Sequence, residues 1–156
     1  MINRLKPKSK PLMKHTIRVS KVINAPLPFV YRWCTDYRED DNKLTGSTAQ
    51  RKILQKTKNR AIYLSVYKSE GKLKYGVNIV HLHPIRSWHL EFLGEEDDEL
   101  GDYRLVKLDS EHTRLDMVFK EKYKISNPPS QAEDLKHTSE LWDKYVTCLE
   151  RDYRKR

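Results

Sequence analysis

Residues 130–155 decide the fold, and they read SQAEDLKHTSELWDKYVTCLERDYRK. Ser130 with Glu133 three positions later is a capping box, a common start of an α-helix. From residue 131 to about residue 155 there is no glycine or proline to end that helix. Side chains at helical spacing form one largely apolar stripe along it: Leu135, Thr138, Leu141, Trp142, Tyr145, Cys148 and Leu149. A helix of about 25 residues is about 37 Å long, so the stripe must be buried against a large surface.

Residues 47–119 supply such a surface, because their apolar side chains alternate with a period of two. Turn sequences at residues 57–59, 70–71 and 110–111 separate the alternating segments, a pattern typical of an antiparallel meander. The side chains that we assign to its inward face are Ile62, Leu64, Val66, Leu73, Tyr75, Val77, Ile79, His81, Trp88, Leu90, Phe92, Tyr103, Leu105, Leu115, Met117 and Phe119. We predict that the concave face of this sheet receives the C-terminal helix.

One more strand and a short helix precede the meander. Residues 16–24 alternate in the manner of a strand, with Ile17, Val19 and Ile23 on one face. Both prolines of Ala25-Pro26-Leu27-Pro28 suit the start of a helix, where no backbone amide hydrogen is needed. Residues 29–36 then show helical spacing of their apolar side chains.

The segment from Val19 to Asp36, VSKVINAPLPFVYRWCTD, resembles a known opening pattern. A strand, a small residue, proline, an apolar–aromatic pair and a final Thr-Asp are similar to the start of the START-like superfamily, also called SRPBCC. A weaker match is residues 112–115, where His112 takes the place of a usual glycine. The resemblance covers residues 15–155. It implies an α+β helix-grip fold, in which a curved antiparallel sheet of about seven strands wraps the long C-terminal helix.

The resemblance also implies a cavity between the sheet and the helix. Members of the superfamily bind lipids, sterols, quinones or polyketides, and some cyclise or dehydrate polyketides. Apolar pockets with a few polar groups are how small-molecule sites are generally built. The candidate ligand-binding residues are Tyr75, Val77, Ile79, His81, Trp88, Leu90, Tyr103, Met117, Trp142 and Tyr145. The plain alternative is that these side chains only fill a core.

His81 is the candidate catalytic residue, since it is the one ionisable group on the inward face of its strand. The alternative is a histidine at a strand end, in solvent or hydrogen-bonded to the backbone. No metal is expected, because His81 and His83 lack the further ligands of a zinc site. No cofactor is expected either, because there is no phosphate loop or dinucleotide fingerprint. Cys34 and Cys148 are interpreted as small core residues.

The net charge of +9 is concentrated at the two ends of the chain. Residues 1–14 hold five basic residues and no acidic one, and residues 151–156 add +3. We interpret residues 1–14 as a basic flexible tail before a single domain at residues 15–156. We expect no stable nucleic-acid complex, because such binding needs basic residues clustered on a folded face. Weak contact of the tails with nucleic acid or an anionic membrane stays open.

Residues 95–99 form an acidic run, EEDDE, which we assign to an exposed loop. The run lacks the alternating ligands and the central glycine of a calcium loop. Because the chain has no apolar run long enough to span a membrane and no secretory signal pattern, we expect a cytoplasmic monomer or dimer.

Three functions follow as hypotheses. The first is a module that encloses an apolar small molecule such as a lipid, quinone or polyketide. The second is a polyketide cyclase or aromatase that uses the same cavity. The third is an interaction platform whose basic ends hold an anionic partner.

Overall fold

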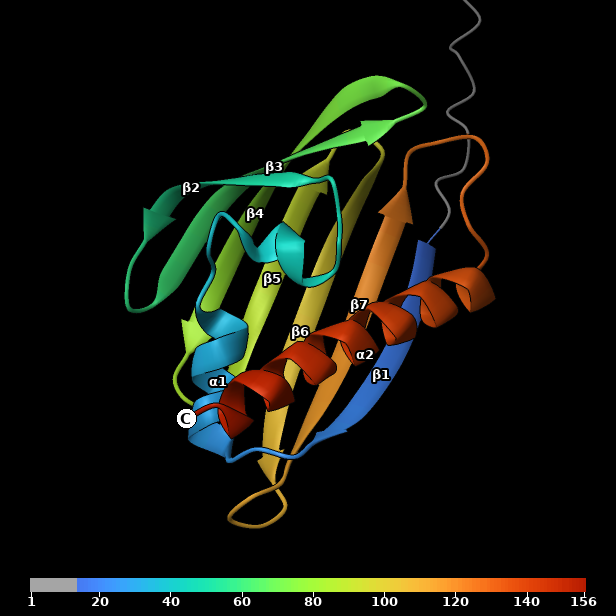
Figure 1. The fold of residues 1–156 in the computed structure, drawn as a ribbon. Helices are drawn as coiled ribbons and strands as arrows, with labels where there is room; N and C mark the ends of the chain where they lie inside the picture. Colours follow the sequence, from blue (N-terminus) through green and yellow to red (C-terminus); the bar gives the residue numbers. More distant parts are fainter. Residues whose placement is uncertain (1–13) are drawn as a thin grey trace, which may run out of the picture.

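The computed structural model describes residues 14–156, which form one antiparallel sheet with helices against its concave face (Figure 1). The strands are β1 (Lys14–Ile23), β2 (Gln50–Lys56), β3 (Arg60–Ser69), β4 (Lys72–His83), β5 (Ser87–Gly94), β6 (Asp97–Lys107) and β7 (Thr113–Tyr123). The helices are α1 (Leu27–Thr35), the 3-10 helix η1 (Asp41–Leu44) and α2 (Gln131–Arg154).

The sheet has the strand order β1-β7-β6-β5-β4-β3-β2, and every neighbouring pair is antiparallel. β2 to β7 therefore form the predicted meander, and β1 completes the sheet beside β7. Figure 1 shows α2 crossing the concave face diagonally over β7 and β1. The predicted helix-grip architecture is confirmed.

Lys14 is the first described residue and the first residue of β1. The rest of the tail predicted at residues 1–14 lies outside the described residues. Between residues 14 and 156, no helix has both the length and the apolar character that crossing a membrane requires.

α2 begins as the sequence predicts, because the Ser130 hydroxyl accepts a hydrogen bond from the Glu133 backbone amide at 3.1 Å. Such a cap satisfies one of the free amides at a helix start. The helix then continues without interruption to Arg154, close to the predicted end.

Polar side chains attach α2 to β1 along its length. The Gln131 side-chain amide donates to the Thr16 carbonyl at 2.7 Å. The ammonium group of Lys21 donates to Ser139 at 2.9 Å and to Asp143 at 2.6 Å. Lys21 interrupts the apolar face of its strand in the sequence, and the structure gives the reason: it holds the middle of the helix.

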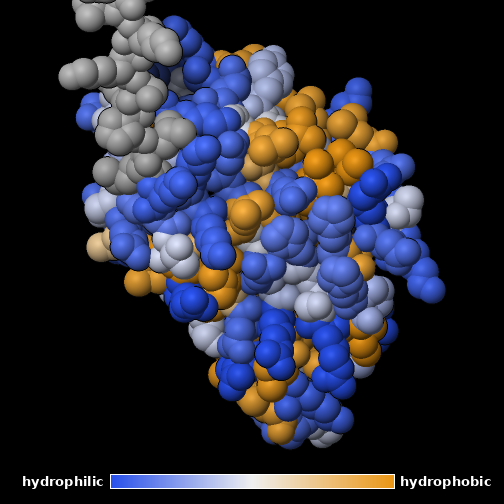
Figure 2. All heavy atoms as spheres, turned by 180° about the vertical axis from the view of Figure 1, so that it is seen from behind, coloured by the Kyte–Doolittle hydropathy of each residue, from blue (hydrophilic) through white to orange (hydrophobic). Residues whose placement is uncertain are grey.

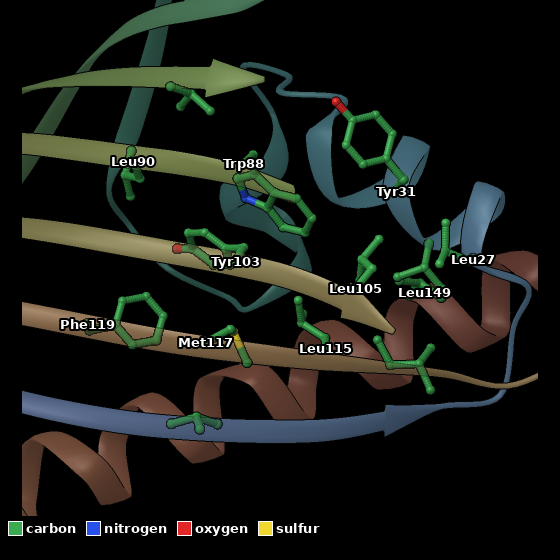
Figure 3. Close-up of a cluster of buried hydrophobic side chains, with 14 of the residues drawn as sticks. Leu27, Tyr31, Trp88, Leu90, Tyr103, Leu105, Leu115, Met117, Phe119 and Leu149 are labelled. Carbon is green, nitrogen blue, oxygen red and sulfur yellow. The ribbon is translucent and has the colours of Figure 1, made fainter. Parts of the chain in front are cut away.

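Apolar packing fixes the C-terminal end of α2 instead. Leu149 is 1% exposed, and Figure 3 shows it in one cluster with Leu27 of α1, Leu105 of β6 and Leu115 of β7. The indole nitrogen of Trp33 in α1 donates to Asp152 at 2.9 Å beside this cluster. The core therefore lies at one end of the trough, between the sheet, α1 and the last turns of α2.

Leu149→Ala is expected to lower the free energy of unfolding by about 3 kcal/mol, because the truncation leaves a cavity in close-packed surroundings. Leu135→Ala is the matched control on the same helix, since Leu135 is 42% exposed. It is expected to change the free energy of unfolding by less than about 0.5 kcal/mol. Urea denaturation of both variants measures the difference, and equal losses would contradict this account of the core.

Candidate functional site

A cavity of about 860 Å³ lies between the concave face of the sheet, α2, α1 and η1. Its volume is in the range of small-molecule sites in proteins. It exists because α2 is attached along β1 and at its C-terminal end, while α1 and η1 cover the part of the concave face beside it.

Aromatic side chains form the central wall of the cavity. Trp88 and Tyr103, on β5 and β6, stack with ring centroids 4.8 Å apart. The Tyr103 ring lies 5.8 Å from that of Trp142 on α2, and Trp142 lies 5.1 Å from Tyr145. Burial, reinforced by the neighbouring Glu99, raises the pKa of Tyr103 well above its usual range, so this hydroxyl remains a hydrogen-bond donor.

Five of the predicted ligand-binding residues lie on the cavity wall, and they are Trp88, Leu90, Tyr103, Trp142 and Tyr145. Met117 has the predicted inward orientation but is 1% exposed and belongs to the core cluster rather than to the wall (Figure 3).

The predicted inward face of β4 is wrong. The strand buries Gly76, Asn78 and Val80, so the residues of the opposite parity face outward. Four side chains that were predicted to face inward therefore lie on the outer face, and they are Tyr75, Val77, Ile79 and His81. The same holds for β3, whose inward residues are Ala61, Tyr63, Ser65 and Tyr67 and whose outward residues are Ile62, Leu64 and Val66.

The error has a physical cause, because the interior side of β3 and β4 carries small or polar residues among its buried positions. Asn78 is 5% exposed, and its amide donates to Ser65 at 2.8 Å, so its burial is satisfied by a partner on β3. Gly76 leaves room for the ring of Phe92, which occupies the place that a Cβ atom would take. Meanwhile the outer face is rich in apolar side chains, which Figure 2 shows from behind. A rule that assigns the more apolar set of alternating residues to the inner face of the sheet therefore gives the wrong face for β3 and β4.

His81 lies on the outer face, where it cannot serve the cavity. Its side chain is 44% exposed, and its Nε2 is 3.7 Å from Glu91 on β5. Its ring lies 6.2 Å from that of His89, the cross-strand neighbour, and His89 pairs with Asp102 at 2.7 Å. His81 is thus a surface histidine, as the alternative interpretation held.

One side of the cavity is basic. The Arg51 guanidinium lies 4.3 Å from the centre of the Tyr63 ring and 5.4 Å from that of Tyr37. Asp41 of η1 binds the same guanidinium, so its positive charge is already paired. Burial raises the pKa of Tyr63 to about 12, an effect that the Arg51 charge partly offsets. This arrangement holds η1 against β2.

The opposite end of the cavity is acidic, and this part of the site was missed in the sequence. The run at residues 95–99 is not wholly a loop, because β6 starts at Asp97. Asp97 and Glu99 line the cavity, as do Glu121 and Tyr123 of β7. The signal was present in the sequence, since residues 97 and 99 share the parity of Tyr103, which was correctly assigned inward.

Two of these carboxyls form a pair without a basic partner. Glu99 and Glu121 are directly opposite each other on β6 and β7. Burial, reinforced by a hydrogen bond shared with Glu121, raises the pKa of Glu99 well above its usual range. Nearby Asp134 of α2 differs, because it accepts hydrogen bonds from Tyr123 at 2.7 Å and pairs with His15 at 2.7 Å.

The two cysteines have no sign of nucleophilic chemistry. Burial raises the pKa of the Cys34 thiol to about 12, which keeps it protonated. Cys148 is buried and its thiol lies 3.5 Å from the Leu44 carbonyl of η1. Within residues 14–156, no three His, Cys, Asp or Glu side chains are grouped so that they could hold a metal ion.

Solved structures share this architecture. The Zhui aromatase/cyclase from Streptomyces sp. R1128 superposes with a TM-score of 0.67 at 14% identity, covering 92% of this chain and 96% of that one. Ara h 8.0201 gives 0.67 at 13% identity over 88% and 98% of the two chains. A START superfamily protein from Mycobacterium smegmatis gives 0.65 at 15% identity over 90% and 98%.

No protein-family model and no curated protein matches the sequence. The structural likeness, at these identities, defines the fold: the chain has the helix-grip fold of START-like (SRPBCC) proteins. The predicted resemblance is thereby confirmed at the level of the fold.

The carboxyl side chains at the acidic end of the cavity make the free energy of unfolding depend on pH. Burial, reinforced by Glu121 and Glu96, raises the pKa of Asp97 to about 6. Because the folded state then holds this proton more tightly than the unfolded chain, the free energy of unfolding rises as the pH falls from about 7 to about 5. Asp97→Asn removes this contribution. The variant is expected to be about 1 kcal/mol more stable than the parent at pH 7.5, after allowance for solvent screening, and to gain less on acidification.

Asp98→Asn is the control for Asp97→Asn, because Asp98 is the next residue and pairs with Lys124 at 2.7 Å. It is expected to bring no stabilisation at pH 7.5. Thermal or urea unfolding at pH 5.5 and 7.5 gives the comparison. If Asp97→Asn is less stable than the parent at pH 7.5, then burial and the neighbouring carboxylates do not destabilise the ionised form of Asp97.

Proposed function

We propose that this protein encloses an apolar or aromatic small molecule in the cavity between the sheet and α2. The observation that supports this most is the cavity of about 860 Å³ with Trp88, Tyr103, Trp142 and Tyr145 on its wall. A domain that needed these side chains only as a core would pack them without such a space, because protein interiors are close-packed.

The expected driving force is the burial of apolar ligand surface against the aromatic wall. A ligand that buries about 250 Å² of apolar surface gains about 6 kcal/mol, from which the cost of immobilising it must be subtracted. Lipids, quinones and polyketide-like molecules are of suitable chemistry. Tyrosines with raised pKa, such as Tyr63 and Tyr103, add hydrogen-bond donors that fix the orientation of a ligand.

The enzyme hypothesis loses its original acid–base candidate, since His81 is outside the cavity. A cyclase-type reaction in this chain would have to use the groups that line the cavity. The binding hypothesis needs no such group and therefore stands first. The platform hypothesis rests largely on residues 1–13, which lie outside the described residues.

Thr138→Trp is expected to weaken ligand binding at least 10-fold, because position 138 on α2 lines the cavity and the larger ring fills it. Thr147→Trp is the matched control, since it makes the same change on the exposed side of the same helix. The probe is N-phenyl-1-naphthylamine, an uncharged dye whose fluorescence rises in apolar surroundings.

We expect saturable binding of the dye to the parent and to Thr147→Trp, with circular dichroism showing intact folding of all three proteins. Equal affinity of Thr138→Trp and the parent would place the bound dye elsewhere. A parent protein that binds no dye would contradict the proposed function.

A further inference from the structure

The two polar regions of the cavity differ in whether their charge is already paired. On the basic side, Arg51 is bound by Asp41 and stacks on Tyr63, so it offers no free positive charge to a ligand. On the acidic side, Glu99 and Glu121 line the cavity as cross-strand neighbours. The cavity is therefore asymmetric, with an unpaired acidic end.

No basic side chain within residues 14–156 forms an ion pair with Glu99 or Glu121, although nearby acids have partners. Asp134 is bonded to His15 and Tyr123, and Asp98 to Lys124. Glu99 and Glu121 instead face each other across β6 and β7 without an ion-pair partner in the part of the chain that the structure describes. Burial, reinforced by Glu121, raises the pKa of the Glu99 carboxyl well above its usual range.

The surroundings of this pair suit an organic cation. Phe119 is the next inward residue on β7, and the ring of Tyr103 extends over Gly101, the next inward position on β6. The centroids of the two rings are 5.5 Å apart, and both residues line the cavity. Aromatic faces and carboxylates together stabilise a positively charged nitrogen. A ligand carboxylate would meet like charge at Glu99 and Glu121 and a neutralised Arg51 on the other side. The remaining basic side chains of the lining on α2, Lys136 and His137, are exposed.

We propose that the ligand of this cavity is an amphiphilic or aromatic amine, whose protonated nitrogen lies at the Glu99–Glu121 pair and whose apolar part lies along Trp88, Tyr103 and Trp142. This inference rests on the proposed function and assigns it a ligand class. It makes Glu99 and Glu121 the residues that determine specificity.

Binding of an amine at this pair must displace a proton. The cation takes the place of the proton held by the Glu99 carboxyl, whose pKa is raised, and that proton passes to the buffer. The affinity for the amine should therefore rise between pH 5.5 and pH 7.5, as ionisation of Glu99 becomes easier. The other charged groups that line this end are the same for every ligand, so an uncharged ligand is the reference for their effect, and they are Asp97, Glu133, Asp134, Lys136 and His137. An uncharged ligand of the same shape should bind without proton release and with little dependence on pH.

Three naphthalene probes of nearly equal shape test the proposal by isothermal titration calorimetry: 2-naphthylmethylamine, 2-naphthalenemethanol and 2-naphthoate. We expect the amine to bind at least 10-fold more tightly than the alcohol at pH 7.5, and the naphthoate more weakly than both. Titrations in phosphate and in Tris, which differ in heat of ionisation, should show proton release for the amine alone.

Glu99→Gln and Glu121→Gln should each reduce the preference for the amine over the alcohol, measured on the same variant, to about 2-fold. Glu140→Gln is the matched control, because Glu140 lines the cavity but is exposed. It should keep the full preference.

If the parent binds amine and alcohol equally, the proposed ligand class is wrong and the proposed function still holds. The same conclusion follows if the preference for the amine survives both substitutions. If none of the three probes binds, the proposed function fails and this inference fails with it.

Discussion

The attachment of α2 to the sheet is the constraint on which the rest of the structure depends. At its start, Asp134 joins His15 and Tyr123, and at its end Leu149 is fully packed. Between them, Lys21 of β1 holds Asp143. These contacts lie along one edge and at one end of the trough, so they fix the helix without filling the concave face. The cavity is a consequence of where the helix is held, rather than of any gap in its apolar stripe.

That geometry divides the concave face into regions with different chemistry. The end near Leu149 is close-packed and supplies stability. The middle is an aromatic wall, and the far end carries the Glu99–Glu121 pair. Burial raises the pKa values of Tyr103 and of Glu99 alike, so the wall offers a protonated hydroxyl beside a carboxyl that holds its proton more tightly than usual. A site of this kind can bind through apolar contact and still discriminate by charge.

The order and type of the elements could be predicted from the sequence, because they depend on local patterns. The cap at Ser130, the uninterrupted helix after it, and the alternation in β1, β5, β6 and β7 all correspond to what the structure contains. The inward side chains of these strands belong to the core or the aromatic wall. The more apolar set of alternating residues is therefore the inward one. Trp88, Leu90 and Tyr103 of the wall were predicted for that reason, and Trp142 and Tyr145 from the helical spacing of α2.

The faces of β3 and β4 could not be predicted by the same rule. Their inward residues include the small Gly76 and the polar Asn78, whereas the apolar Val77 and Ile79 point outward. The acidic end was missed for a related reason: a run of acidic residues usually indicates a solvated loop, and only the parity shared with Tyr103 shows that Asp97 and Glu99 point inward. Alternation identifies strands, but it assigns faces only where the interior is apolar.

The central claim is that α2 lies over the sheet with its aromatic residues facing β6 across the cavity. Nuclear Overhauser effects between ring protons measure this most directly, because they report distances below about 5 Å between hydrogens. With ring centroids 5.8 Å apart, Trp142 and Tyr103 should give clear cross-peaks in the ligand-free protein. Absence of these cross-peaks, with those between Trp88 and Tyr103 present as an internal reference, would show that the helix does not lie over the concave face and would contradict the account.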